Sequence, residues 1–458
     1  MVAAHAPSVR EGVSKDRLCA PVKAALRALA TATVGLIAAC GDAQGPVLVV
    51  PVTAVASAPA AVPAQGRSYD KELASADKAI AQARQQMAQQ PDNLVLVQQT
   101  VSLLLERARL GGKLEDYGQA QDLLDGAASQ NGPAAALCPA RARLHFSLHR
   151  LRPAGAALAE CAGLMEPLEA GALAADIAFY SGDYRQAETL YRDLVNQGGN
   201  TGQYIRLALF RAKMGAPGEA AALLEAAEKR YHGGSPSTIT WLRLQRGEIA
   251  WQRGRLDEAL ALYQLASDAM PGWWLLDEHV AEIRRLQDDT VGAQAILQRL
   301  IARDARPEHM DELARLLIDG PTPEAARPWI ARAQDIHRSR LQAFPEAAAG
   351  HAVDHFLQFG SPAEALTLAR RNATARPFGE ARITLAAALL RAGKAGEAAA
   401  TIRSVQDSGW STAQLHAVSA QIHAAIGQTA MADARRAQAI AMNPHAMRLY
   451  QLTPPMQP

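Results

Sequence analysis

The chain has 458 residues, enough for two to four ordinary domains or for one repeat array that grows without a central core. Hydrophobic residues make up 49% of the sequence but aromatic residues only 5%, so its apolar content is largely Ala and Leu and favours helices over strands. A net charge of +2 gives no strong electrostatic field, which argues against nucleic acid as the partner.

The first 39 residues have the parts of a secretory signal. An uncharged run over residues 28–39 is too short to span a bilayer and ends in small residues. The basic residues before it are Lys15, Arg17, Lys23 and Arg27. The sequence Ile37-Ala38-Ala39-Cys40 resembles the lipobox of bacterial lipoproteins, which implies cleavage before Cys40 and a lipid on its thiol. The alternative is an ordinary cysteine in an Ala-rich terminal helix.

Residues 40–68 are predicted to be a tether between this lipidated cysteine and the folded part. They are rich in Ala, Val and Pro, and the spacing of the prolines prevents a continuous helix. A short strand over residues 47–50 is the alternative. The next segment, residues 69–91, carries Ala79 twelve residues before Pro91 and predicts one helix that caps an exposed end of the repeats.

From residue 92 onward the same spacing of small residues recurs. The clearest segment runs from Thr240 to Pro271, with a turn glycine at Gly254, then Ala259, an aromatic residue at Tyr263 and the closing proline. The alanines in equivalent positions are Ala120, Ala156, Ala187, Ala220, Ala259, Ala293, Ala325, Ala365, Ala398 and Ala432, a mean spacing of about 35 residues. The turn glycines five residues earlier are Gly182, Gly215, Gly254, Gly320, Gly360, Gly393 and Gly427.

This spacing resembles the tetratricopeptide repeat (TPR). The resemblance implies an all-α fold, a right-handed α-solenoid (superhelix) of about ten TPR-like helix hairpins. Repeats are expected over residues 92–231 and 239–445, with an irregular loop at 232–238 as the point where the array breaks and a C-terminal tail at 446–458. The second repeat is the poorest, because Leu151 replaces the turn glycine although Ala156 stays in phase.

In TPR proteins the first helices of the repeats line a concave groove. The residues of this chain at the equivalent repeat positions are therefore candidate partner-binding residues. They are Arg141, His145, His149, Asp176, Tyr180, Arg206, Gln245, Glu248, Gln252, Glu278, His279 and Glu282. This groove is polar and of mixed sign. The resemblance therefore implies a protein or peptide ligand.

Three further pairs of side chains have a spacing that is typical of disulfides or of metal sites. Cys138 and Cys161 lie at the same end of one predicted hairpin, so they form either a disulfide or two buried free thiols. His145 with His149, and His351 with His355, have the i, i+4 spacing that can chelate a metal, but no third ligand follows from the sequence. We therefore expect no metal site and no cofactor.

The sequence contains no phosphate-binding loop, no H-E-x-x-H helix and no G-x-S-x-G elbow, so we expect no enzyme. The leading hypothesis is a non-catalytic protein-interaction scaffold, a membrane-anchored periplasmic TPR lipoprotein that assists assembly of an envelope or export complex. One alternative is a cytoplasmic TPR regulatory adaptor without a lipid anchor. Another is a groove-bound ligand or metal-dependent activity built on His145 and His149. The sequence leaves open the partner, the choice of inner or outer membrane, the true start codon and the oligomeric state.

Overall fold

The computed structural model describes residues 68–131, 135–161 and 163–452. The predicted signal peptide, Cys40 and nearly all of the predicted tether, including its alternative strand, lie outside these residues. Over the described ranges the chain forms helices and no strand, with one isolated bridge between Met214 and Ser411. None of the described helices combines the length and the apolar character needed to cross a membrane.

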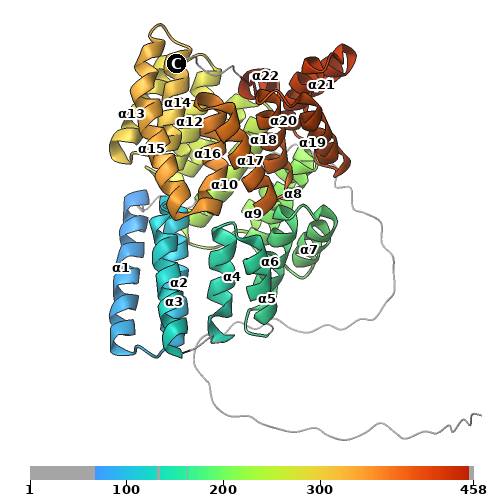
Figure 1. Cartoon of the computed structure of the whole chain (residues 1–458). Helices are drawn as coiled ribbons and strands as arrows, with labels where there is room; N and C mark the ends of the chain where they lie inside the picture. The colour runs from blue at the N-terminus through green and yellow to red at the C-terminus, as the bar shows by residue number, and fades with distance from the viewer. Residues whose placement is uncertain (1–67, 132–134, 162, 453–458) are drawn as a thin grey trace, which may run out of the picture. The chain divides into compact units, whose positions relative to one another are not determined.

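Helix α1 (Tyr69–Gln89) is followed by ten hairpins, each a first helix packed against the next helix in sequence (Figure 1). The first helices are α2 (Leu94–Gly111), α4 (Cys138–Ser147), α6 (Pro167–Tyr180), α8 (Thr201–Lys213), α10 (Pro236–Gln252), α12 (Trp274–Leu286), α14 (Pro307–Ile318), α16 (Pro345–Phe359), α18 (Gly379–Arg391) and α20 (Ala413–Ala425). The second helices are α3 (Glu115–Asn131), α5 (Leu151–Glu160), α7 (Tyr184–Asn196), α9 (Pro217–Arg230), α11 (Leu256–Ala269), α13 (Thr290–Arg303), α15 (Arg327–Ala343), α17 (Pro362–Ala375), α19 (Ala395–Asp407) and α21 (Thr429–Met442). Two 3-10 segments, η1 (Ala135–Leu137) and η2 (Pro323–Ala326), and a last turn, α22 (Ala446–Leu449), complete the described residues.

The segment Thr240–Pro271 shows why this sequence pattern makes a hairpin. Gly247 on α10 faces Tyr263 on α11, and a Cβ at residue 247 would lie 2.3 Å from the tyrosine ring. Only glycine lets the aromatic ring fill the space between the two helices. Ala259 is fully buried for the same reason, since a small side chain allows the helices to approach closely.

The alanine predicted to be buried between the two helices is buried in eight of the ten hairpins. In the other two the prediction is wrong, and a different alanine is buried. In the second hairpin Ala156 is exposed, and Ala154 takes the buried position five residues after His149, whose φ of 62° makes the turn. In the seventh hairpin Ala325 is exposed and Ala326 is buried at the end of η2. The second unit turns at His149 without a glycine, and in the seventh the 3-10 segment η2 lies between the turn and α15, which shifts the buried alanine out of the expected phase.

The loop at residues 232–238 does not interrupt the array. Helix α9 ends at Arg230 and α10 begins at Pro236. Leu224 on α9 and Leu242 on α10 belong to one buried apolar cluster that continues across the loop. The expected break between two parts of the array is therefore wrong.

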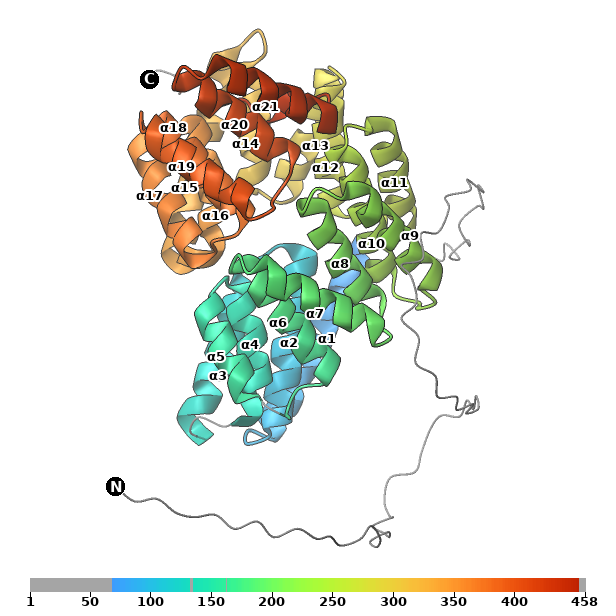
Figure 2. The same cartoon turned by 90° about the vertical axis from the view of Figure 1, so that its right-hand side faces the viewer.

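The later hairpins stack on the earlier ones with an offset of six units. Arg306, at the start of the seventh unit, donates to the carbonyl of Gly112 in the turn of the first unit, at 3.2 Å. Gly379 N, in the ninth unit, donates to the hydroxyl of Tyr184 in the third, at 2.7 Å. Ser411 N, in the tenth, donates to the carbonyl of Lys213 in the fourth, at 2.9 Å. Figures 1 and 2 show the orange helices α15–α17 above the teal helices α3–α5.

The same stacking reaches both ends of the repeat array. Tyr69 N, at the start of α1, donates to the carbonyl of Pro271 at 3.0 Å, and the Tyr69 side chain is only 5% exposed. At the other end, Arg448 of α22 donates to the carbonyl of Arg285 at 3.0 Å. Beyond Tyr69, helix α1 buries only Ile80 and Ala83 and leaves its outer face exposed, so its role as a cap on the first repeat stays a prediction. Residues 446–452 of the predicted tail pack on the sixth unit.

Candidate binding cavity

A cavity of about 830 Å³ lies along helix α1 and the first helices of the first six units, with Phe146 as the contribution of the second unit. The beginning of α18, with Phe378 and Glu380, closes one side of it because the ninth unit stacks on the third. The predicted groove residues that line this cavity are Asp176, Tyr180, Arg206, Gln245, Glu248, Gln252 and His279. The concave surface is thus an enclosed cavity with openings, where the sequence predicted an open groove.

Two walls of the cavity carry the same polar arrangement. Asp176 on α6 accepts hydrogen bonds from the Tyr191 hydroxyl at 2.8 Å and from Arg206 Nε at 2.9 Å. Glu248 on α10 accepts a hydrogen bond from the Tyr263 hydroxyl at 2.6 Å and lies 3.2 Å from His279 Nδ1. In both cases a first-helix carboxylate meets a tyrosine of its own hairpin and a basic side chain of the next.

These contacts fix the electrostatic state of the wall. Burial raises the pKa of Asp176, while the Arg206 guanidinium and the hydrogen bonds from Arg206 and Tyr191 oppose the rise. Burial and the Asp176 charge together raise the pKa of Tyr191 well above its usual value, so this hydroxyl stays a donor. The wall is therefore already hydrogen-bonded internally.

An aromatic cluster forms one end of the cavity. Tyr180 packs edge-on against Phe378 of the stacked ninth unit, with ring centroids 5.0 Å apart. Phe179 lies 6.1 Å from Phe210 and stacks on Trp410 at 5.9 Å. Burial raises the pKa of Tyr180 to about 12, so its hydroxyl remains neutral. This end offers apolar surface to a ligand, and the sequence did not predict it because Phe378 and Trp410 come from distant repeats.

Exposed charges lie on another part of the cavity lining. Glu106 and Arg109 on α2 are both exposed and line the cavity. Glu106 lies six residues before the turn glycine Gly112, as the carboxylates of the two walls lie six residues before theirs, but neither Glu106 nor Arg109 was named as a groove candidate. Their ionic groups are free to meet a ligand.

Five predicted groove residues lie elsewhere. Because the second hairpin is shifted by two positions, Arg141 turns toward Glu160 of its own hairpin, with an N–O distance of 3.4 Å. His149 sits in the turn, where its Nε2 accepts a hydrogen bond from Arg376 at 3.1 Å. Burial and this guanidinium lower the pKa of His149 to about 3.

The other three do not line the cavity either. Burial and the charge of Arg150 lower the pKa of His145. Glu278 pairs with His309 Nε2 at 2.9 Å, and Glu282 lies one turn further along α12. His145 and His149 share no metal-binding face, because α4 ends at Ser147 and His149 pairs with a guanidinium. The alternative of a metal-dependent activity on these two histidines is wrong.

Cys138 and Cys161 form a disulfide, with their Cα atoms 5.4 Å apart. The bond joins the start of α4 to the residue after α5, and both cysteines are buried. It closes the second hairpin at the end opposite its turn.

No protein-family model and no curated protein matches the chain. Among solved structures, a tetratricopeptide repeat protein from Parabacteroides merdae is 18% identical, with 55% of this chain and 98% of that chain covered and a TM-score of 0.33. Yeast Tom70 is 13% identical, with 84% and 91% covered and a TM-score of 0.40. A chain of the APC/C Cut9–Hcn1 hetero-tetramer is 15% identical, with 84% and 72% covered and a TM-score of 0.41.

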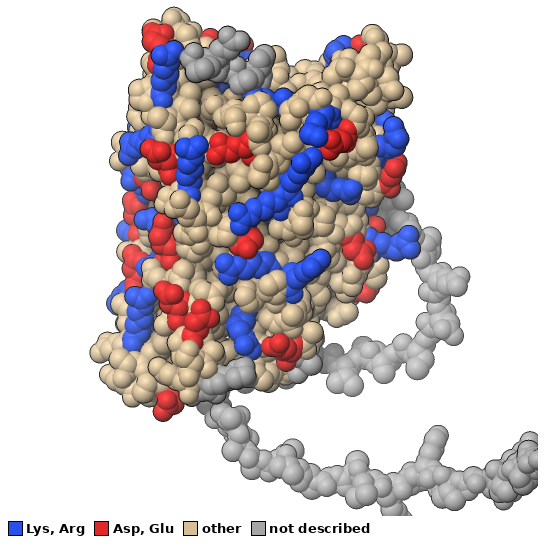
Figure 3. Space-filling view, in the orientation of Figure 1, with Lys and Arg blue, Asp and Glu red and all other residues tan. Residues whose placement is uncertain are grey.

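The TM-scores of these superpositions are too low to support an argument about this chain. Its fold is assigned from its own consecutive helix pairs. The fold is a TPR-like α-solenoid. Its outer surface carries interspersed acidic and basic side chains on the face shown in Figure 3, as the small net charge implies. The cavity within the TPR-like solenoid is the candidate binding site.

Proposed function

We propose that the chain is a non-catalytic scaffold that binds an extended segment of a partner protein in the cavity. The observation that carries this proposal is the lining of the cavity by the first helices of six units and by the stacked α18. A volume of about 830 Å³ falls within the range of ligand pockets, which suits a short peptide segment and not a folded domain.

The lining suggests the chemistry of that segment. The aromatic end with Tyr180 and Phe378 would take an apolar or aromatic side chain, since such rings gain from edge-to-face packing. The exposed Glu106 and Arg109 would meet ionic groups of both signs. We therefore expect an apolar anchor flanked by charged residues.

We further propose that the scaffold works in the bacterial cell envelope, tethered through a lipid on Cys40 and facing the periplasm, where it helps to assemble an envelope or export complex. Support comes from the signal-like leader and from Ile37-Ala38-Ala39-Cys40. Radiolabelled fatty acid should enter the wild type and not Cys40→Ala. An unlabelled, full-length protein in the cytosol would instead support the regulatory adaptor.

Photo-crosslinking tests the cavity. A benzoylphenylalanine at Gln252, which lines the cavity, should capture a partner through one short contiguous segment. The control is the same residue at Ala261, which is exposed on the second helix α11 of the same unit. Equal capture from both positions, or crosslinks spread over a folded domain, would contradict binding in the cavity.

A further inference from the structure

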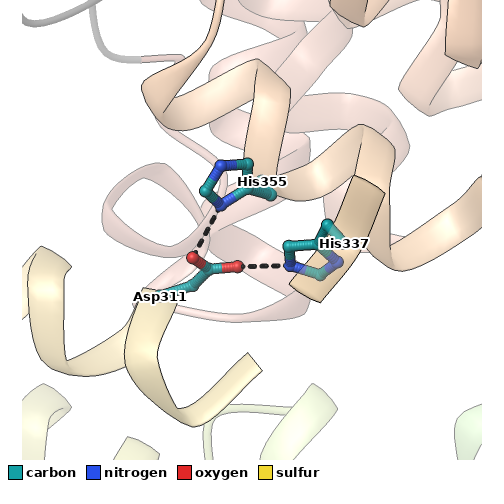
Figure 4. Close-up of side chains that lie close together, drawn as sticks. All are labelled: Asp311, His337 and His355. Atoms are coloured by element: carbon teal, nitrogen blue, oxygen red, sulfur yellow. Dashed lines mark hydrogen bonds and ion pairs between the residues drawn. The ribbon is translucent and has the colours of Figure 1, made fainter. Parts of the chain in front are cut away.

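Three side chains from successive helices meet beside the junction of the seventh and eighth units (Figure 4). Asp311 lies on α14, His337 on α15 and His355 on α16. The two carboxylate oxygens of Asp311 each face one imidazole, at 3.0 Å from His337 Nε2 and 2.7 Å from His355 Nδ1. No part of the proposed peptide cavity includes them.

The cluster is dry. The side chains of Asp311, His337 and His355 are 10%, 1% and 0% exposed. The two imidazoles lie 4.9 Å apart, and Phe356 and Phe359 pack against the ring of His355. His355 Nε2 is buried and has no hydrogen-bond partner.

The charge balance distinguishes Asp311 from its neighbours on α14. Glu308 pairs with Arg340 at 2.8 Å, and Glu312 pairs with Arg315 at 3.0 Å. Among the residues that the structure describes, Asp311 pairs only with the two imidazoles. A buried carboxylate with no guanidinium or ammonium partner is costly away from water, and a divalent ion at this place would balance its charge.

The donor geometry suits a metal ion. One ligand atom from each of the three residues lies within 4.8 Å of the others. Two imidazole nitrogens and one carboxylate oxygen are ligands that zinc and related divalent ions accept, at about 2.0–2.2 Å. Small side-chain shifts would turn both hydrogen bonds of Asp311 into shared coordination of one ion.

We propose that Asp311, His337 and His355 bind one divalent transition-metal ion of the zinc type. The ion balances the buried carboxylate and ties together three helices of the seventh and eighth units. His351, the i, i+4 neighbour of His355, is outside the site, because its side chain is 69% exposed and lies 4.0 Å from Glu308.

The test uses the untagged full chain, titrated with Co²⁺ and Zn²⁺ against a chromophoric chelator. The wild type should bind one ion at this site, show the visible absorption bands of low-coordinate Co²⁺, and melt at a higher temperature with Zn²⁺. His337→Gln and His355→Gln should lose the Co²⁺ bands and weaken Zn²⁺ binding at least a hundredfold. The matched control His351→Gln, from the same helix, should bind as the wild type does.

Absence of ion binding by the wild type, or equal binding by all three variants, would overturn the proposal. Circular dichroism checks that each variant is folded. If the two histidine variants unfold, X-ray absorption of the Zn²⁺-loaded wild type decides without them. Two imidazole ligands support the site, and none or one overturns it.

Discussion

Replacing Gly254 and Gly427 separately by Ala tests the stacking of the later repeats on the earlier ones. Both glycines lie in turns between a first and a second helix, with φ of 70° and 74°. Alanine in this left-handed conformation costs roughly 1–2 kcal/mol, partly offset by a less flexible unfolded chain. The backbone cost is therefore nearly the same at the two sites.

Of these two glycines, Gly254 alone contacts a segment that stacks on its turn. A Cβ there would be 2.6 Å from Pro444 Cδ and 2.8 Å from Asn443 Oδ1, while a Cβ at residue 427 meets no atom within 4 Å. Relieving such a clash typically costs about 1–3 kcal/mol. Gly254→Ala should therefore lower the free energy of unfolding by about 1–3 kcal/mol more than Gly427→Ala does.

Urea denaturation followed by circular dichroism measures this difference. Hydrogen exchange shows where in the chain the change occurs. Gly254→Ala should lower the protection of backbone amides around Asn443 and α22 as well as in its own turn. Equal destabilisation by the two variants, with unchanged protection of α22, would refute the stacking.

Three further predictions follow from buried groups. Arg306→Met should lower stability by about 2–4 kcal/mol in urea denaturation, because it leaves the stacked carbonyls of the first unit without their donor. Replacing both Cys138 and Cys161 by Ala should cost about 2–4 kcal/mol by the same assay. His149 has its pKa lowered from 6.5 to about 3, so its contribution is complete above pH 6.5 and is lost as the pH falls toward 3. His149→Asn, which tolerates the left-handed turn, should make stability less pH-dependent over that window, by up to about 1.4 kcal/mol per pH unit.

Each of these has its own contrary result. Arg284→Met removes a more exposed guanidinium and should cost under about 1 kcal/mol, so a loss as large as that of Arg306→Met would contradict the stacking contact. Reductant that leaves the wild type's urea midpoint unchanged would contradict a stabilising disulfide. Parallel stability curves for His149→Asn and wild type between pH 6.5 and 4 would contradict the neutral buried imidazole.

The local features of the fold could be read from the sequence because they depend on neighbours about one repeat away. The spacing from Gly247 to Tyr263 encodes one hairpin, and the same pattern repeats in most others. The turns at His149 and Asp288 take positive φ without a glycine, so the glycine pattern carries no signal there. The sixth hairpin was still placed correctly through Ala293, whereas the second was misplaced because Ala156 and the buried Ala154 both fit the spacing loosely. Gly320 and Gly360 stand in register but do not take positive φ.

The stacking and the clusters built by it could not be predicted in the same way. Arg306 meets its carbonyl acceptors across 194 residues or more, and the superhelical pitch that brings them together is a sum of small rotations between units. His355 was paired by spacing with His351, whereas its real neighbours, Asp311 and His337, lie on two other helices. The carboxylate, tyrosine and basic group of each cavity wall recur at similar separations, so that signal was present in the sequence and was missed.

Binding of the captured segment as a synthetic peptide tests the central claim most directly. Reversing the exposed cavity charges with Glu106→Lys and Arg109→Glu should weaken its binding about tenfold, or roughly 1.4 kcal/mol. The control Glu258→Lys changes an exposed charge on the second helix α11, and it should leave the affinity unchanged. Unchanged affinity in the cavity variants, or an equal loss in the control, would contradict binding inside the solenoid.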